Sequence, residues 1–185
     1  VRVSKGDDDL GWGITCVDKM AFEGIAPIYK EANPNVRALG GIFGIYHLHI
    51  CSAKEVGITT VEEMAEMVKE GKAIKVAAPM KGTSEYPLIN AILGFYGIYA
   101  DMVTLFKDRH VDFVFTHLAI PAAAITEMAV SRDMTVLAYS KECIEFMHNT
   151  WGTLSEESGH CVIPAGTYKG QEIDVPTAAT AGELI

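Results

Sequence analysis

Residues 73–96, AIKVAAPMKGTSEYPLINAILGFY, join a short apolar run, a glycine turn and a longer apolar segment. The apolar run Ala73–Ala78 predicts a buried strand that ends at Pro79. From Leu88 to Tyr96 the apolar residues recur at helical spacing, and Gly97 then predicts a stop. The stretch therefore predicts a strand, a turn and a helix, which is the repeating unit of an α/β protein.

The same alternation of strands and helices continues on both sides of this unit. The capping-box pattern Thr60–Glu63 begins a helix that closes at Gly71. Further strands are predicted at 111–116 and 134–139, each followed by a helix, and a helix is favoured over a strand for 99–108. This order predicts an α/β fold whose sheet is rich in parallel strands joined by right-handed crossovers.

The composition of the 185 residues disfavours several classes of protein. Hydrophobic residues make up 49% of the chain, which is enough for a buried core. Asp and Glu number 24 against 15 Lys and Arg, and the net charge of −9 does not suit binding to nucleic acid or an anionic membrane. His47 and His49 would share one face of a strand but lack a third ligand nearby, and the four cysteines show no C-x-x-C pair. No metal or other cofactor is therefore predicted.

Two strand ends are the best candidates for a ligand site, because ligands of open α/β sheets bind beyond the carboxyl ends of the strands. The turn after the first strand offers backbone N–H groups, hydroxyls and a positive charge at the start of a helix, through Lys81, Gly82, Thr83 and Ser84. An ordinary capped turn explains these residues equally well. The loop Thr116–Pro121 follows a second strand, and its His117 is either a ligand donor or a structural histidine.

The most specific motif is Ile163–Thr177, IPAGTYKGQEIDVPT. It closely resembles the signature of the TAXI family, the extracytoplasmic solute receptors of TRAP (tripartite ATP-independent periplasmic) transporters. Other landmarks follow in the order of that family, among them Asp9–Trp12, the Gly82–Thr83 turn and Ile120–Pro121. The resemblance therefore spans nearly the whole chain.

The resemblance implies a type II periplasmic-binding-protein-like fold, with two lobes of parallel-rich sheets joined by a hinge. Residues 1–47 and 162–185 would form parts of lobe 1 with the hinge segments, and 48–161 would form lobe 2. The ligand-binding residues that it implies are Thr15, Lys81, Gly82, Thr83, Ser84, His117, Leu118, Pro121 and Tyr168. We therefore expect a periplasmic or otherwise extracytoplasmic receptor with no enzymatic activity. It would close on a small organic anion, a dicarboxylate such as 2-oxoglutarate or an amino acid such as glutamate, and deliver it to TRAP membrane subunits.

The chain departs from the family pattern in ways that predict an incomplete first lobe. Elements that the family has before Val1, near Gly97–Tyr99 and after Ile185 have no counterpart here. Where the family commonly has a Gln–Ser pair, this chain has Ile14 and Thr15, and only Thr15 can donate a hydrogen bond. A true fragment would leave an apolar face and a sheet edge uncovered, so a homodimer is expected in that case.

Two other functions remain open at this point, because a fold does not dictate a function. An enzyme on the same scaffold would need a pair of titratable groups, for which His117 and Tyr168 are weak candidates. A periplasmic sensor domain would use the same closure of two lobes to signal.

Overall fold

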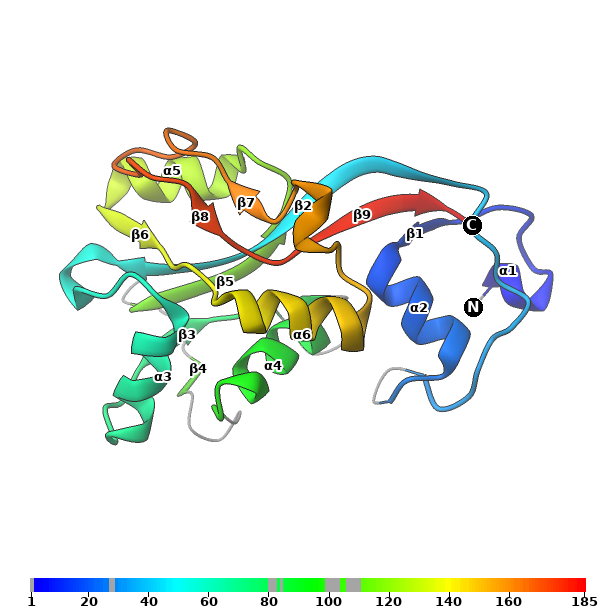
Figure 1. The fold of residues 1–185 in the computed structure, drawn as a ribbon, viewed down its shortest axis with the longest axis horizontal. Coiled ribbons are helices and arrows are strands. Elements are labelled where there is room, and N and C mark those ends of the chain that lie inside the picture. Colours follow the sequence, from blue (N-terminus) through cyan, green and yellow to red (C-terminus); the bar gives the residue numbers. More distant parts are fainter. Residues whose placement is uncertain (1, 27–28, 80–82, 84, 99–103, 106–110) are drawn as a thin grey trace.

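The computed structural model describes residues 2–26, 29–79, 83, 85–98, 104–105 and 111–185, which form a curved mixed sheet with helices on both faces (Figure 1). The helices are α1 (Arg2–Lys5), α2 (Thr15–Glu23), α3 (Val61–Lys69), α4 (Glu85–Phe95), α5 (Ala123–Ser131) and α6 (Lys141–Trp151). The strands are β1 (Trp12–Ile14), β2 (Gly40–Ala53), β3 (Lys75–Ala77), β4 (Thr104–Leu105), β5 (Phe113–Leu118), β6 (Met134–Val136), β7 (Val162–Ile163), β8 (Val175–Pro176) and β9 (Ala179–Leu184). Short 3-10 helices lie at Lys54–Val56 and Glu156–Ser158.

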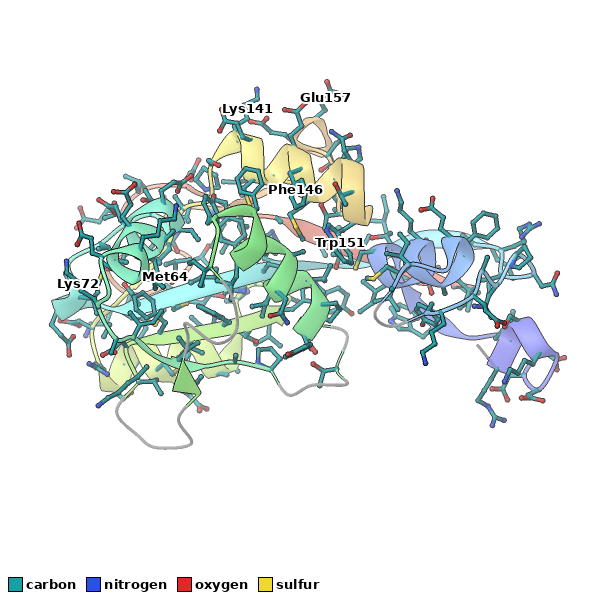
Figure 2. The ribbon with its side chains drawn as sticks, turned by 90° about the horizontal axis from the view of Figure 1, so that it is seen from below. Met64, Lys72, Lys141, Phe146, Trp151 and Glu157 are labelled. Carbon is teal, nitrogen blue, oxygen red and sulfur yellow. The ribbon has the colours of Figure 1, made fainter. Side chains whose placement is uncertain are left out.

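The described residues gather into two bodies of unequal size (Figure 1). The larger body carries α3, α4, α5 and α6, and the smaller one carries α1, α2 and β1. The strands β2 and β9 pair antiparallel and continue from one body into the other, with His47 opposite Ala179 in the register. Trp151, at the end of α6, lies where the two bodies meet (Figure 2). The two bodies are thus connected through a shared sheet.

The strand order is β1-β9-β2-β5-β3-β4, and β6 also pairs with β2. The long strand β2 is antiparallel to β5, β6 and β9. Among the described pairings of named strands, those of β3 with β4 and with β5 are the parallel ones, and the isolated bridge between Thr60 and Ala138 is parallel too. The expectation of a parallel-rich sheet is therefore wrong for most of the sheet, because the 14-residue strand β2 recruits antiparallel neighbours along both of its edges.

Two apolar cores lie on opposite faces of the sheet. The first is packed between the sheet and α3, α4 and α6, and includes the fully buried Leu48, Ile50 and Phe113. The second is packed against α5 and the β7–β8 hairpin, and includes Cys51 and Ile125. Strand β2 contributes to both cores because successive side chains of a strand point to opposite faces.

The structure bears out the helix start predicted at Thr60 but not the predicted helix at 99–108. The capping box is present, since the Thr60 hydroxyl accepts from the Glu63 N–H and the Glu63 carboxylate accepts from the Thr60 N–H. Within 99–108, the pair Thr104–Leu105 is strand β4, and the remaining residues lie outside the described ones. The apolar spacing in this segment fits a helix or a strand, and at Thr104–Leu105 the pairing with the edge of β3 stabilises the strand. No helix among the described residues is long and apolar enough to cross a bilayer.

Gly24 ends α2 in the left-handed region, at φ 73°, where a Cβ would lie 2.5 Å from the backbone nitrogen of Ala32. We expect Gly24→Ala to lower the free energy of unfolding by about 1–2 kcal/mol, from backbone strain and this close approach together. The matched control is Gly57→Ala, at φ 78°, where a Cβ would meet nothing within 4 Å. Denaturant unfolding of both variants measures the difference, and equal losses would show that the contact with Ala32 costs nothing.

Candidate functional site

A hollow of about 400 Å³ lies at the carboxyl ends of β3 and β5, where α4 and α5 begin. The two strands are parallel neighbours, with Val76 opposite Phe113 in the register, so their carboxyl ends meet at one edge of the sheet. Thr83 and Leu118 line the hollow together with Glu85. The two strand ends that the sequence marks as candidates therefore lie together, and ligand binding there remains a prediction.

The structure brings only some of the predicted ligand-binding residues to this hollow. Thr83 and Leu118 line it, whereas Lys81, Gly82 and Ser84 lie outside the described residues. The loop after β5 turns through a cis Ile120–Pro121 peptide bond and leads into α5, whose residues Ala124, Ile125 and Met128 complete one side of the hollow. Pro121 therefore precedes a helix that lines the hollow but is not itself among the lining residues.

His117 points to the opposite face of the sheet from its neighbour Leu118. It lies across from Leu48 in the register, is 4% exposed, and its Nε2 atom is 2.8 Å from the Thr180 hydroxyl. Burial lowers the pKa of His117 to about 4, although the charge of Glu85 acts in the other direction. His117 is therefore a neutral histidine held by the fold, which favours the structural interpretation over the ligand donor.

Tyr168 of the signature motif connects three segments of the chain on the α5 side of the sheet. Its hydroxyl accepts the Ala122 N–H at 3.1 Å and lies 3.0 Å from Nε2 of His49. The Nδ1 atom of His49 lies 3.0 Å from the carbonyl of His47, which can only accept, so Nδ1 carries the proton and Nε2 accepts from the Tyr168 hydroxyl. Tyr168 is thus a buried structural link.

The pair of titratable groups that an enzyme on this scaffold would need is not brought together. His117 lies on the face of Leu48, whereas Tyr168 binds His49 on the other face. Among the described residues, no group of three or more His, Cys, Asp or Glu side chains is placed to hold a metal ion.

Thr15 lies in the smaller body, at the first position of α2, and is not among the residues that line the hollow. Its hydroxyl accepts the Ala181 N–H at 3.4 Å, which ties the start of the helix to β9. The predicted role of Thr15 in ligand binding therefore needs a movement of the smaller body toward the strand ends of β3 and β5.

The whole chain, residues 1–185, matches the NMT1-like family. The chain belongs to this family. No curated protein matches it. Among solved structures, apo YehZ from Escherichia coli is similar over 100% of this chain and 64% of its own, with 12% identity and a TM-score of 0.38. This NMT1-like chain therefore spans less than two thirds of the YehZ chain.

Sequence reasoning missed Glu85, which among the described residues is the charged one that lines the hollow of this NMT1-like protein. The residue is half-buried at the first position of α4. A carboxylate is common in the first turn of a helix, so the sequence offered no signal for a second role. Its negative charge disfavours a purely anionic ligand and favours one that also carries a positive group.

Replacing Tyr168 by Phe removes one hydroxyl that serves two buried partners, His49 and the Ala122 N–H. We expect Tyr168→Phe to lower the free energy of unfolding by about 1–2 kcal/mol, since both partners would stay buried. The control is Tyr46→Phe, because no hydrogen bond of the half-buried Tyr46 hydroxyl is found among the described residues. Denaturant unfolding compares the two variants, and an equal effect would contradict the linking role of Tyr168.

Proposed function

We propose that this NMT1-like chain is an extracytoplasmic solute-binding receptor of the TAXI type, which captures a small organic anion and passes it to TRAP transporter membrane subunits. The observation that carries the proposal is the hollow at the carboxyl ends of β3 and β5, where α4 and α5 begin. The Ile163–Thr177 motif and membership of the NMT1-like family support it. The proposed location is the periplasm or another extracytoplasmic space.

The start of α4 supplies the physical basis for holding a carboxylate. The first N–H groups of a helix have no partner within the helix, and the helix dipole places partial positive charge there. Thr83, two residues before the helix, lines the hollow and brings a hydroxyl to the same place. A ligand carboxylate would accept hydrogen bonds from these groups, and Lys81 in the same turn would add its positive charge.

Glu85 favours an amino acid over a dicarboxylate as the solute. No ion pair of Glu85 is found among the described residues, and its carboxylate lines the same hollow as Thr83. An α-amino group would neutralise this charge, whereas a second carboxylate near it would be repelled. We therefore propose an amino acid such as glutamate ahead of 2-oxoglutarate or another dicarboxylate.

The proposed mechanism is closure of two lobes in a type II periplasmic-binding-protein-like fold, a shift of population rather than a reaction. The strands β2 and β9 connect the two bodies, so bending would occur along them. The predicted boundary between lobes, at residues 47 and 48, falls within β2. Closure in this sense would bring Thr15 toward the hollow.

A homodimer of this chain also remains a prediction, supported by the surface of the smaller body. Large apolar side chains are exposed there, namely Leu10, Trp12, Phe22, Leu39, Ile42 and Phe43. Two of these rings, Trp12 and Phe43, lie 5.5 Å apart. Several large exposed apolar side chains on one body favour contact with another macromolecule.

Replacing Thr83 by Val tests the proposed site. We expect Thr83→Val to weaken binding of the preferred amino acid about tenfold, because the side chain keeps its shape and loses its hydroxyl. The control is Thr126→Val on α5, whose hydroxyl donates to the Ala122 carbonyl and which does not line the hollow. Isothermal titration of the full chain measures both, and unchanged affinity in Thr83→Val would remove this turn from the site.

A further inference from the structure

A second hollow, of about 520 Å³, lies between β6 and the loop that joins β7 to β8. Met134 and Val136 of β6 form one wall, and Ile173 and Val175 form another. The segments of β6 and β8 meet just before α6, where the Tyr139 N–H donates to the Pro176 carbonyl at 2.9 Å. Of the described residues, none lines both this hollow and the one at the ends of β3 and β5.

The outer edge of β6 faces this hollow. The inner edge pairs antiparallel with β2, and the Leu137 N–H donates to the Ile50 carbonyl at 2.8 Å. Because the direction of the backbone groups alternates along an antiparallel strand, those of Met134 and Val136 point away from β2. Both residues line the hollow, so their outward N–H and carbonyl groups border it.

Only the end of this outer edge is paired. The Ala138 N–H donates to the Thr59 carbonyl at 2.9 Å, and the Ala138 carbonyl accepts the Val61 N–H at 3.0 Å. Within the described part of the chain, no backbone hydrogen bond reaches the outward groups of Met134 or Val136. Val136 is 6% exposed, and a strand edge with unpaired groups is a template for another strand.

Two side chains that line the hollow, Gln171 and Lys54, each have a polar group without a hydrogen-bond or ion-pair partner among the described residues. The Oε1 atom of Gln171 is buried without a hydrogen bond, although its Nε2 atom donates to the carbonyls of Ile163, Pro164 and Ile173. Lys54 lines the hollow and forms no ion pair with any described residue.

The acidic residues beside Lys54 in the sequence and across the strand pair are already engaged. Glu55 binds Arg132, and Asp133 binds Lys169 at 3.2 Å. The Lys54 N–H donates to the Asp133 carbonyl, which places Lys54 at the Met134 end of β6, the end away from the paired Ala138. A negative charge on an incoming molecule would therefore meet an unneutralised cation at this end.

We propose that this hollow binds an extended segment of a partner polypeptide, which adds to the outer edge of β6 as a short strand and places an acidic side chain beside Lys54. Alternate N–H and carbonyl groups of such a segment match the outward groups of Met134 and Val136. This site is separate from the proposed solute site, so failure of one proposal does not affect the other.

The test selects peptides from a displayed library of random heptapeptides on the purified full chain. The enriched peptide is then synthesised in two forms, one unmodified and one with N-methyl groups on the alternate amides that face β6. We expect N-methylation to weaken binding at least about tenfold, because the methyl groups remove the donors that strand addition needs. Failure to enrich any peptide, or equal binding of both forms, would overturn the proposal.

Variants of the protein and hydrogen exchange locate the peptide. Lys54→Glu is expected to weaken binding about tenfold, whereas Glu172→Gln, an exposed charge on another wall of the hollow, should leave it unchanged or stronger. Both substitutions are at exposed positions and should leave the fold intact. Bound peptide should slow amide exchange at Met134 and Val136, and protection confined to another part of the chain would contradict the assignment.

Discussion

Acidification from about pH 6.5 to about pH 4 should cost this protein about 3 kcal/mol of unfolding free energy for each of two buried histidines. Burial lowers the pKa of both His49 and His117 from 6.5 to about 4. In the unfolded chain these imidazoles bind protons throughout this window, while in the folded protein they stay neutral. The unfolded state therefore binds more protons, and stability is lost as the pH falls.

Urea unfolding at about pH 7.5 and about pH 5 measures this loss in the wild type and in His49→Gln and His117→Gln. Each variant should lose less stability on acidification than the wild type does, even if it is less stable at the higher pH. His160→Gln serves as the control, because His160 is exposed. If all four proteins show the same pH dependence, the two buried histidines are not its source.

Asp18 has the opposite effect and should destabilise the protein as the pH rises from about 4 to about 7. Burial and the neighbouring carboxylate of Glu183 raise the pKa of Asp18 to about 7. The Asp18 carboxyl lies against the backbone of Gly13, where a Cβ would come within 1.8 Å of its Oδ2 atom. The folded state keeps a proton that the unfolded chain releases near pH 3.8, so stability falls with rising pH in this window.

The variant Asp18→Asn isolates this effect. The full difference in pKa corresponds to about 4 kcal/mol, and partial exposure of Asp18 reduces the expected gain above pH 7 to about 2 kcal/mol. At about pH 4 the gain should disappear, because Asp18 is then protonated in the folded wild type. Urea unfolding across this range measures the gain, with Asp9→Asn at an exposed position as the control. A gain that does not change with pH would contradict the account.

Local structure was predictable from the sequence wherever it depends on neighbouring residues. The strand–turn–helix unit from 73 to 96 and the capping of α3 at Thr60 follow from residue spacing and hydrogen-bonding side chains. His47 and His49 share one face of a strand, as their spacing predicts, with ring centroids 6.3 Å apart. These features need no knowledge of the remaining chain.

Strand pairing was not predictable in this way. The 14 residues of β2 include glycines and polar residues that interrupt its apolar pattern, so the sequence did not reveal its length or its antiparallel partners. The register of β2 with β5 then places His117 opposite Leu48 and turns Leu118 to the other face. Thr83 and Leu118 share the hollow, whereas His117 and Tyr168 are separated, because this register decides which side chains meet.

The central claim is that the chain holds a small carboxylate at the carboxyl ends of β3 and β5. Native mass spectrometry of the full chain tests it most directly, with glutamate, other amino acids and dicarboxylates including 2-oxoglutarate added in turn. The account predicts a one-to-one complex with at least one of these compounds, with amino acids preferred, and a weaker complex in Thr83→Val. A chain that retains none of them, or a complex equally abundant in Thr83→Val, would contradict it.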